Sequence, residues 1–511
     1  MAQAIMLQGT SSHVGKSILT TALCRIFKQD GQKVTPFKAQ NMALNSYVTK
    51  TGGEMGRAQV AQAEAAGLDP TVEMNPVLLK PTGNSCSQVI VMGKPVGNMS
   101  AKEYHSGYSL KALGVVTECL RKLHKDFDTI VIEGAGSPAE VNLKDNDIVN
   151  MRVAKLAGAP VLLIADIDRG GALASIVGTL ELLEPDERDL VKGIIINKFR
   201  GDISLLKPAL DFLEAKTGKP VIGVVPHLDK LGIDDEDSVS LEEKEQPAKK
   251  EGELDIAVLR LPKISNFTDF DALANESDVR LRYVRKGEAL GNPDLIILPG
   301  SKNTTEDLLY LRENGYEREI IKRVKSGTPV VGICGGYQML GREVQDPDHT
   351  ESDLDEVMGL GLIDSITVFA ANKVTHQVKA VAVNHKFLGI NYSGDNLTGY
   401  EIHMGCTQFL SPVDPAFTID TRSGKQVQMP DGAVTADGLV MGTYMHGIFD
   451  NDAYRRAVLD ALRVRKGLAP LGVIVDTQAL KDAAYNRLAD VVRRSMDIDL
   501  VYRIMNEANG R

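Results

Sequence analysis

The chain has 511 residues, which is too long for one ordinary hydrophobic core and predicts two domains or, at most, three. Its 43% hydrophobic and 25% charged residues are typical of a globular protein, and with no long apolar run or signal-peptide pattern we expect no membrane span and a cytoplasmic location. The net charge of −10 argues against nucleic acid as the natural partner, because binding phosphate backbones requires a concentrated basic face.

Short apolar runs alternate with helical patterns over the first 232 residues. The runs are AIMLQG, KVTPFK, DTIVIEGAG, APVLLIADID, VKGIIINK and KPVIGVVP, and a helix is expected from about Lys16 to Gln29. Continuous apolar runs between helices are typical of parallel strands that are covered on both faces. We therefore predict a doubly wound α/β domain over residues 1–232, with its ligand site in the loops that follow the strands.

A glycine-rich turn, GTSSHVGKS, follows the first of these strands and opens the first helix, as a phosphate-binding loop does. Backbone N–H groups around Gly9, Thr10 and Gly15 would cradle the phosphates, Lys16 would neutralise their charge, and Ser17 would hold Mg²⁺. The loop departs from the usual pattern, because five residues rather than four separate its two glycines. ATP and Mg²⁺ are the cofactors that this loop predicts.

Polar residues at the ends of later strands are candidates to complete this site. Glu133 in VIEGAG is a candidate ligand of Mg²⁺, although a strand-end carboxylate in water is the alternative. Asp145 and Asp147, in NLKDNDIVN, either bind metal or substrate or simply form a turn. Two further strand ends provide Asp166, Asp168 and Arg169, and then Asn197, Lys198 and Arg200. Asn197 lies where an amide can read a purine base.

The composition changes over residues 233–253, where DDEDSVSLEEKEQPAKKEGE is dense in both charges. This stretch predicts a solvated linker, with a long surface loop as the alternative. Strands resume at DIAVLRL, RLRYV, DLIILPGS and TPVVGICGG, which predicts a second α/β domain over residues 254–450. The last segment, residues 451–511, is expected to be helical.

The stretch VGICGGYQML places Cys334 between glycines where a predicted strand passes into a helix. Small neighbours permit the sharp turn of a nucleophile elbow, and the helix N-terminus favours the reactive thiolate. An inert core cysteine is the alternative, but burial alone requires no flanking glycines. The other cysteines form no CxxC pair and are expected to be inert: Cys24, Cys86, Cys119 and Cys406.

A cysteine nucleophile needs a base, and two histidines are candidates. His446, in GTYMHGIFD, follows a predicted strand and could reach the elbow, whereas His403 lies in YEIHMG. The oxyanion formed on attack needs two N–H donors, for which we expect Gly335 and either Gly300 or Ser301 of LPGSKNT.

Several of these motifs resemble known families. GTSSHVGKS, with its five-residue spacing, and EGAG resemble the dethiobiotin synthetases and their relatives, which use ATP to activate carboxylates. FKAQNMALNS, EMGRAQVAQAEAAG, MNPVLLKP and EGAGSPAEVNL resemble the cobyric acid synthases of cobalamin biosynthesis, and this resemblance extends along the whole chain. GICGGYQML and YMHGIF resemble the cysteine and histidine motifs of class I glutamine amidotransferases.

The resemblance implies a dethiobiotin synthetase-like P-loop ATPase domain fused to a flavodoxin-like class I glutamine amidotransferase domain. It implies that Cys334 and His446 hydrolyse glutamine, that His403 is a structural or interface residue, and that Lys38 of FKAQNMALNS joins the nucleotide site. One position departs from the class, because Ile448 stands where many members have a glutamate that orients the histidine. Either the cysteine and histidine suffice, or another group takes the orienting role.

The resemblance also implies a corrinoid substrate. This is adenosylcobyrinic acid a,c-diamide, amidated through acyl phosphates at its b, d, e and g carboxylates. Such a large substrate needs a wide site, for which a homodimer is one expectation. The alternatives are an a,c-diamide synthase, a ligase that amidates a cell-wall lipid precursor, and a partitioning-type switch ATPase whose second domain is a non-catalytic binding module.

Overall fold

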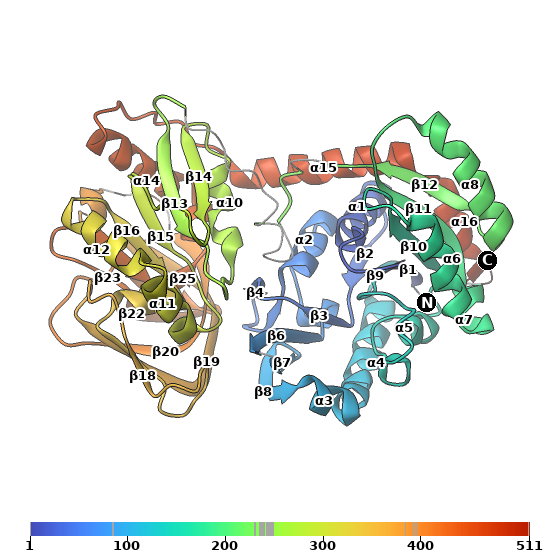
Figure 1. The fold of residues 1–511 in the computed structure, drawn as a ribbon, viewed down its shortest axis with the longest axis horizontal. Coiled ribbons are helices and arrows are strands. Elements are labelled where there is room, and N and C mark those ends of the chain that lie inside the picture. Colours follow the sequence, from blue (N-terminus) through green and yellow to red (C-terminus); the bar gives the residue numbers. More distant parts are fainter. Residues whose placement is uncertain are drawn as a thin grey trace. The chain divides into compact units, whose positions relative to one another are not determined.

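The computed structural model describes residues 2–83, 86–228, 231–234, 241, 250–383, 385–390, 392, 394, 396–508 and 510. The chain forms two compact units (Figure 1). Unit 1 contains Met1–Ala43, Met55–Glu236 and Gln478–Arg511, and unit 2 contains Leu44–Glu54 and Asp237–Thr477. Most of the predicted linker, residues 235–240 and 242–249, lies outside the described residues.

The first half of the chain contains most of unit 1. Its elements are β1 (Gln3–Gly9), α1 (Lys16–Gln29), β2 (Val34–Phe37), β3 (Gln40–Met42), β4 (Ser46–Val48), β5 (Glu54–Gly56), α2 (Arg57–Ala66), η1 (Val72–Met74), β6 (Val77–Gly83), β7 (Cys86–Val91), β8 (Lys94–Ser100), α3 (Ala101–Glu103), η2 (Tyr104–Tyr108), α4 (Ser109–Asp126), β9 (Thr129–Glu133), η3 (Lys144–Asn146), α5 (Met151–Ala157), β10 (Val161–Asp166), α6 (Ala172–Leu182), α7 (Pro185–Leu190), β11 (Val191–Phe199), α8 (Ile203–Thr217) and β12 (Val221–Pro226).

The second half of the chain contains most of unit 2. Its elements are β13 (Leu254–Leu259), η4 (Phe267–Phe270), α10 (Asp271–Ala274), β14 (Val279–Val284), β15 (Leu295–Leu298), α11 (Thr304–Glu313), α12 (Tyr316–Lys325), β16 (Val330–Ile333), α13 (Gly335–Leu340), β17 (Glu343–Gln345), β18 (Glu356–Met358), β19 (Ser365–Ala382), η5 (Phe387–Gly389), β20 (Leu397–Phe409), β21 (Phe417–Arg422), β22 (Lys425–Asp431), β23 (Ala433–Val434), β24 (Val440–Thr443), β25 (Met445–His446), η6 (Ile448–Asp450), α14 (Asp452–Arg465), α15 (Thr477–Ser495) and α16 (Ile498–Ala508). Among the described residues, no helix has the length and apolarity of a membrane span.

A six-stranded sheet in the order β12-β11-β10-β1-β9-β2 forms the centre of unit 1, and all its pairings are parallel. One face packs against α4, α5 and α6, and the other against α1, α2, α15 and α16 (Figure 1). In the register, Gly9 lies beside Ile164 and Leu7 beside Glu133, so the loop after β1 and the end of β9 share one sheet edge. The predicted doubly wound fold is confirmed.

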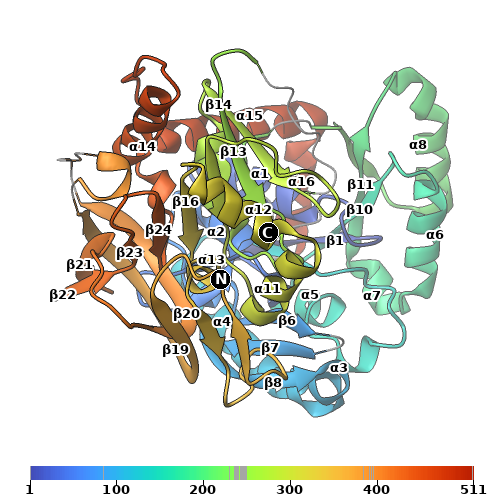
Figure 2. The ribbon, with the colours of Figure 1, turned by 60° about the vertical axis from the view of Figure 1, so that its left-hand side comes forward.

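Unit 2 contains a second sheet in the order β14-β13-β15-β16-β24-β23. Its first five strands are parallel and have the 2-1-3-4-5 order of flavodoxin-like folds, so this prediction is also confirmed. A separate, mainly antiparallel sheet contains the long strands β19 and β20 together with β17, β18, β21, β22 and β25 (Figure 2).

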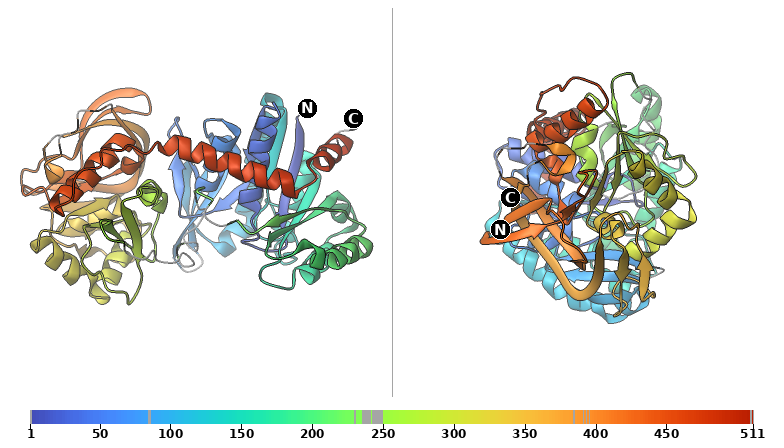
Figure 3. Two further views of the ribbon diagram at one scale, coloured as in Figure 1. Left: turned by 90° about the horizontal axis from the view of Figure 1, so that it is seen from above. Right: turned by 90° about the vertical axis from the view of Figure 1, so that its left-hand side faces the viewer.

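The two units differ from the predicted domain ranges in two places. The short segment Leu44–Glu54 belongs to unit 2, although it lies within the range predicted for the first domain. The predicted C-terminal helical segment is divided, since residues 451–477 belong to unit 2 and Gln478–Arg511 belongs to unit 1. The physical reason is burial, because Leu488 and Val492 of α15, the long straight helix in the left view of Figure 3, join the same apolar cluster as β1.

A buried ion-pair cluster connects α14 to the loop before β14 in unit 2. Arg455 Nε donates to Glu276 Oε1 at 2.7 Å, and Arg456 donates to both Glu276 and Asp278. The Arg455 side chain has no exposed area and that of Glu276 is 2% exposed. The cluster therefore holds charges that water cannot stabilise if a partner is removed.

We predict that Glu276→Ala lowers the free energy of unfolding by about 3 to 5 kcal/mol, because it leaves two buried guanidinium groups without this partner. Denaturant titration of the full chain measures the change. Glu118→Ala removes the partner of Arg121 in an exposed pair and is the control, expected to unfold like the wild type. Equal stability of the two variants would contradict the prediction.

Candidate functional site

The glycine-rich turn after β1 closes around its own lysine. Lys16 Nζ donates to Ser11 O at 2.9 Å and to Gly136 O at 3.1 Å. Gly15 has φ +97°, and a Cβ at this position would lie 2.2 Å from Asn197 Nδ2. Asn197 in turn donates to Val14 O at 2.7 Å. Glycine is therefore required at position 15 both for its backbone conformation and for its space.

Glu133 is the centre of a buried polar cluster beside this loop. Its Oε1 accepts hydrogen bonds from Ser17 Oγ at 2.9 Å and from Lys38 Nζ at 2.8 Å, and its Oε2 accepts one from Gln62. The structure thus brings together Ser17, Lys38 and Glu133, three residues singled out from the sequence. Gln62 was missed. Its only sequence signal is its place in EMGRAQVAQAEAAG, on α2.

The donors in this cluster fit a magnesium nucleotide. Mg²⁺ at nucleotide sites takes one or two protein oxygens, with phosphates and waters completing its shell. The Ser17 hydroxyl and the Glu133 carboxylate, 2.9 Å apart, provide such a pair. Among the described residues there is no group of three or more His, Cys, Asp or Glu side chains able to hold a metal alone.

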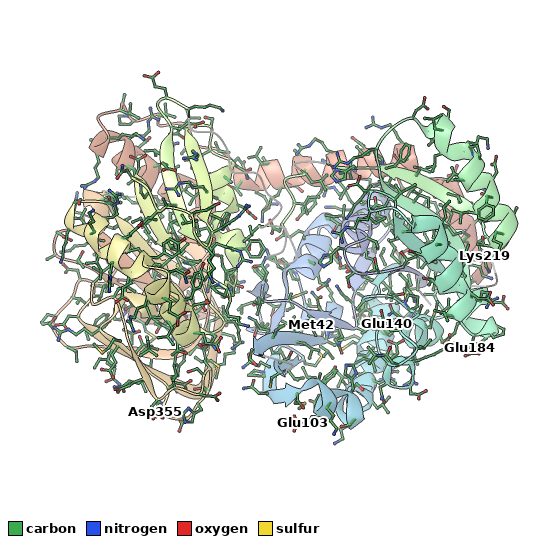
Figure 4. The ribbon with its side chains drawn as sticks, in the orientation of Figure 1. Met42, Glu103, Glu140, Glu184, Lys219 and Asp355 are labelled. Atoms are coloured by element: carbon green, nitrogen blue, oxygen red, sulfur yellow. The ribbon has the colours of Figure 1, made fainter. Side chains whose placement is uncertain are left out.

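The two loop aspartates have other contacts. The Asp147 carboxylate accepts the N–H groups of Val149 and Asn150, at 2.8 and 3.1 Å, and burial raises its pKa. Asp145 is exposed and its carbonyl accepts a bond from Arg152, while Glu140 of the same loop is also exposed (Figure 4). The structure thus gives Asp147 a role in the loop turn, and metal binding by either aspartate stays a prediction.

Two other predicted nucleotide-site groups already have protein partners. The Thr10 N–H donates to Ile164 O at 2.9 Å, which extends the pairing of β1 with β10. Lys198 Nζ bonds Asp166 Oδ2 at 2.9 Å and His13 O at 2.7 Å. These contacts fix the loop against the end of β11.

Cys334 occupies a strained bend between β16 and α13. Its φ of 52° and ψ of −109° are unfavourable for a residue that carries a side chain. A Cβ on Gly335 would lie 2.8 Å from Ser301 N, and one on Gly336 would lie 2.0 Å from Leu298 O. The tight bend predicted around the thiol is present, and the two glycines permit it.

His446 is buried and has a carboxylate partner. Its Nδ1 lies 2.6 Å from Asp269 Oδ2, and Asp269 Oδ1 accepts the Gly447 N–H at 3.0 Å. Burial alone lowers the pKa of His446, but the charge and hydrogen bond of Asp269 and the hydrogen bond with Cys334 raise it to about 10. The imidazole is therefore coupled to both the Cys334 thiol and the Asp269 carboxylate.

Asp269 was missed in the sequence. It lies in NFTDF, far along the chain from both Cys334 and His446 and outside any motif quoted for the site. Only the fold of η4 brings it to the histidine.

His403 has a different environment. Its ring stacks on Tyr444 with centroids 3.8 Å apart, and its Nδ1 lies 2.8 Å from Gly405 O. Burial lowers its pKa to about 4, so the ring is neutral near pH 7. Cys334 Sγ lies 3.4 Å from the carbonyl oxygen of the neighbouring Ile402. The contacts thus favour His446 over His403 as the partner of the thiol.

The loop LPGSKNT lies against the elbow. A Cβ on Gly300 would be 3.2 Å from His446 Cε1, and a Cβ on Gly335 would be 2.8 Å from Ser301 N. The hydrogen bonds from Ser265 N–H to Gly300 O and from Lys302 N–H to Lys263 O do not use the Ser301 N–H. Of the two donors expected from this loop, the geometry favours Ser301.

Polar side chains form a further cluster next to the elbow. Thr304 Oγ1 donates to Gln338 Oε1 at 3.0 Å, and Thr304 N–H donates to Glu351 Oε2 at 3.1 Å. Burial raises the pKa of Glu351. Asp355 of the same loop is exposed, as Figure 4 shows. Glu351 was missed because its acidic surroundings in the sequence look like an exposed loop.

Comparisons with known proteins match both units. Residues 5–240 match the family model described as "CobQ/CobB/MinD/ParA nucleotide binding domain", and residues 255–454 match "CobB/CobQ-like glutamine amidotransferase domain". The chain is similar to a cobyric acid synthase of Pelotomaculum thermopropionicum, at 59% identity over 99% of this chain and 97% of that one. It is also similar to cobyric acid synthases of Moorella thermoacetica (56%; 99% and 98%) and Desulforamulus reducens (53%; 100% and 99%).

We predict that His446→Gln lowers the rate of glutamine hydrolysis by at least about a thousandfold, because the thiol loses its proton partner. His403→Gln should keep most of the rate, because its ring is neutral and bonded to a carbonyl. Glutamate release by the full-length variants measures both. A larger loss in His403→Gln than in His446→Gln would reverse the assignment.

Proposed function

The chain belongs to the cobyric acid synthase family, and from this we propose that it amidates a corrinoid with glutamine as nitrogen donor and ATP as activating nucleotide. The substrate is adenosylcobyrinic acid a,c-diamide, and its b, d, e and g carboxylates receive the amides. The proposal rests on the observation that one chain contains both a phosphate-binding loop beside Glu133 and a pair formed by Cys334 and His446. A homodimer and a cytoplasmic location stay predictions.

In the first unit, a carboxylate oxygen of the substrate takes the γ-phosphoryl group of ATP and ADP leaves, which gives an acyl phosphate. This activation is needed because a free carboxylate is a poor electrophile. The N–H groups of the turn and Lys16 bind the phosphates of ATP. Ser17 and Glu133 would hold Mg²⁺, which when bound offsets charge on the transferring phosphoryl group. Ammonia then attacks the acyl carbon, and the bond to the phosphate oxygen breaks to leave the amide and inorganic phosphate.

In the second unit, the Cys334 thiolate attacks the side-chain amide carbon of glutamine. The Gly335 and Ser301 N–H groups stabilise the oxyanion, and His446 gives a proton to the departing ammonia. Water then attacks the thioester as His446 takes a proton from it, which releases glutamate and restores the thiolate. Gln338 and Glu351, which accept hydrogen bonds from Thr304 next to the elbow, are the candidates to bind the α-amino and α-carboxylate groups of glutamine.

Asp269 takes the orienting role for which this chain has no glutamate after the histidine. Its 2.6 Å contact with Nδ1 fixes the ring and leaves Nε2 for the proton transfers. The alternative of an unassisted cysteine and histidine is therefore not favoured by the contacts.

The function is tested by following amides on the corrinoid by mass spectrometry. With ATP, Mg²⁺ and glutamine, the wild type should add an amide at each of the b, d, e and g positions. Cys334→Ser should add them only when free ammonia is supplied, because its phosphate site is intact. Lys16→Met should add none with either donor.

Two outcomes would contradict this function. If glutamine is untouched and ATP turns over without regard to the corrinoid, the chain is a switch ATPase with a binding module. If only the a and c positions of cobyrinic acid are amidated, it is an a,c-diamide synthase.

We predict that Asp269→Asn lowers kcat for glutamine hydrolysis by at least about a hundredfold, because the amide carries no charge and, with its oxygen on the Gly447 N–H, turns its NH₂ group toward Nδ1. Loss of the carboxylate also lowers the pKa of His446. The imidazolium that protonates ammonia then loses its proton at a lower pH. The alkaline limb of the pH profile of kcat/KM therefore moves to lower pH. If the alkaline limb of this profile does not move, Asp269 does not set the pKa of His446.

A further inference from the structure

Asn266 lies beside the candidate base in a conformation that asparagine tolerates better than most residues. Its φ is 52° and ψ is 37°, and it is 2% exposed. Its Nδ2 lies 3.5 Å from His446 Nε2, while its Oδ1 accepts the Ser46 N–H at 3.0 Å and the Ser46 hydroxyl at 3.5 Å. Because Oδ1 faces these donors, the NH₂ group faces the imidazole.

A second neighbour of the imidazole is tied to the same residue. The Tyr400 ring stacks on His446, with centroids 5.1 Å apart and planes at 12°, and its hydroxyl donates to Ser46 O at 3.3 Å. Hydrogen bonds to the main chain of Ser46 thus hold both Asn266, which faces Nε2 of His446, and Tyr400, which stacks on the imidazole ring.

The segment that carries Ser46 is fixed to strand β19. Lys373 Nζ bonds Glu54 Oε2 at 2.6 Å in a buried pair, and Thr375 Oγ1 donates to Gly52 O at 2.8 Å. Gln377 donates to Val48 O. These contacts give Leu44–Glu54 a fixed place in unit 2, so Ser46 presents its main chain to Asn266 and Tyr400 from a rigid support.

We propose that Asn266, held by the main chain of Ser46, is a positioning residue of the glutaminase reaction, an inference that rests on the proposed function. Its NH₂ group donates to Nε2 when the imidazole is neutral, and so favours the tautomer whose Nδ1 proton is bonded to Asp269. In this tautomer Nε2 takes a proton from the attacking water during thioester hydrolysis, and the water replaces the long 3.5 Å contact between Nε2 and Asn266 as it does so. Imidazolium carries a proton on Nε2 and cannot accept this bond.

The titratable groups of the described residues that contact or electrostatically affect His446 are Asp269, Cys334, Tyr400 and His403. In the thioester, Cys334 carries no charge and His403 is neutral. Asp269, which favours the charged ring, and Asn266, which favours the neutral ring, then remain as the opposing partners of the imidazole.

The test compares Asn266→Ala and Asn266→Asp in the full chain, with Asn314→Ala as the matched control at the end of α11. Asn266→Ala should lower kcat for glutamine hydrolysis about tenfold with KM little changed, because one hydrogen bond to the base is lost. The acid limb of kcat should move to higher pH, since the neutral ring loses a donor. The thioester should accumulate and be seen by mass spectrometry after acid quenching.

Asn266→Asp keeps the size of the side chain and the acceptor for Ser46, so it tests the same idea if the alanine variant fails to fold. A carboxylate beside Nε2 stabilises imidazolium, and the acid limb should move further in the same direction. Asn314→Ala should behave as the wild type.

A kcat within about twofold of the wild type and an unmoved acid limb would overturn the inference. A loss of kcat that merely follows a loss of Tm, with no shift of the limb, would also overturn it, since a purely structural role predicts that result. Retained amidation by Asn266→Ala with free ammonia locates the defect in the glutaminase. A wild type that hydrolyses no glutamine would overturn the proposed function itself.

Discussion

A buried carboxylate held by donors from distant parts of the chain is the interaction on which each candidate site depends. Glu133, 1% exposed, binds Ser17, Lys38 and Gln62, and Asp269, 3% exposed, binds His446 and the Gly447 N–H. Burying such charges is costly unless each is paired. The pairs therefore fix the positions of the surrounding loops as firmly as they fix the reacting groups.

The sequence predicted the fold well where local patterns control it. The turn from Gly9 to Ser17 joins β1 to α1 as expected, the first helix spans Lys16–Gln29 as predicted, and both central sheets contain the parallel strands expected from the apolar runs. The sequence did not predict the features that depend on packing between distant parts of the chain. Nothing in the composition of Leu44–Glu54 or of α15 indicates the unit to which each belongs, because burial against distant strands decides this.

The residues of the candidate sites likewise fall into those that the sequence predicted and those that it did not. Lys16, Ser17, Cys334 and the two glycines after it could be predicted because tight turns demand particular residues at fixed spacing. Asp269 could not, since an orienting carboxylate needs only to reach the ring and can come from any loop. The metal roles given to Asp145 and Asp147 rested on composition alone, and the bonds of Asp147 to its own loop show how turn formation produces the same pattern.

The chain places contacts of both sites on one short stretch. Lys38 bonds Glu133 in unit 1, and Ser46, eight residues later, bonds the asparagine beside His446 in unit 2. The motif FKAQNMALNS spans both positions, so its sequence is constrained by two chemistries at once. Loss of the Lys38 side chain therefore removes a partner of Glu133, whereas a change of the main chain at Ser46 alters the support of Asn266, and amidation with free ammonia measures the first effect apart from the second.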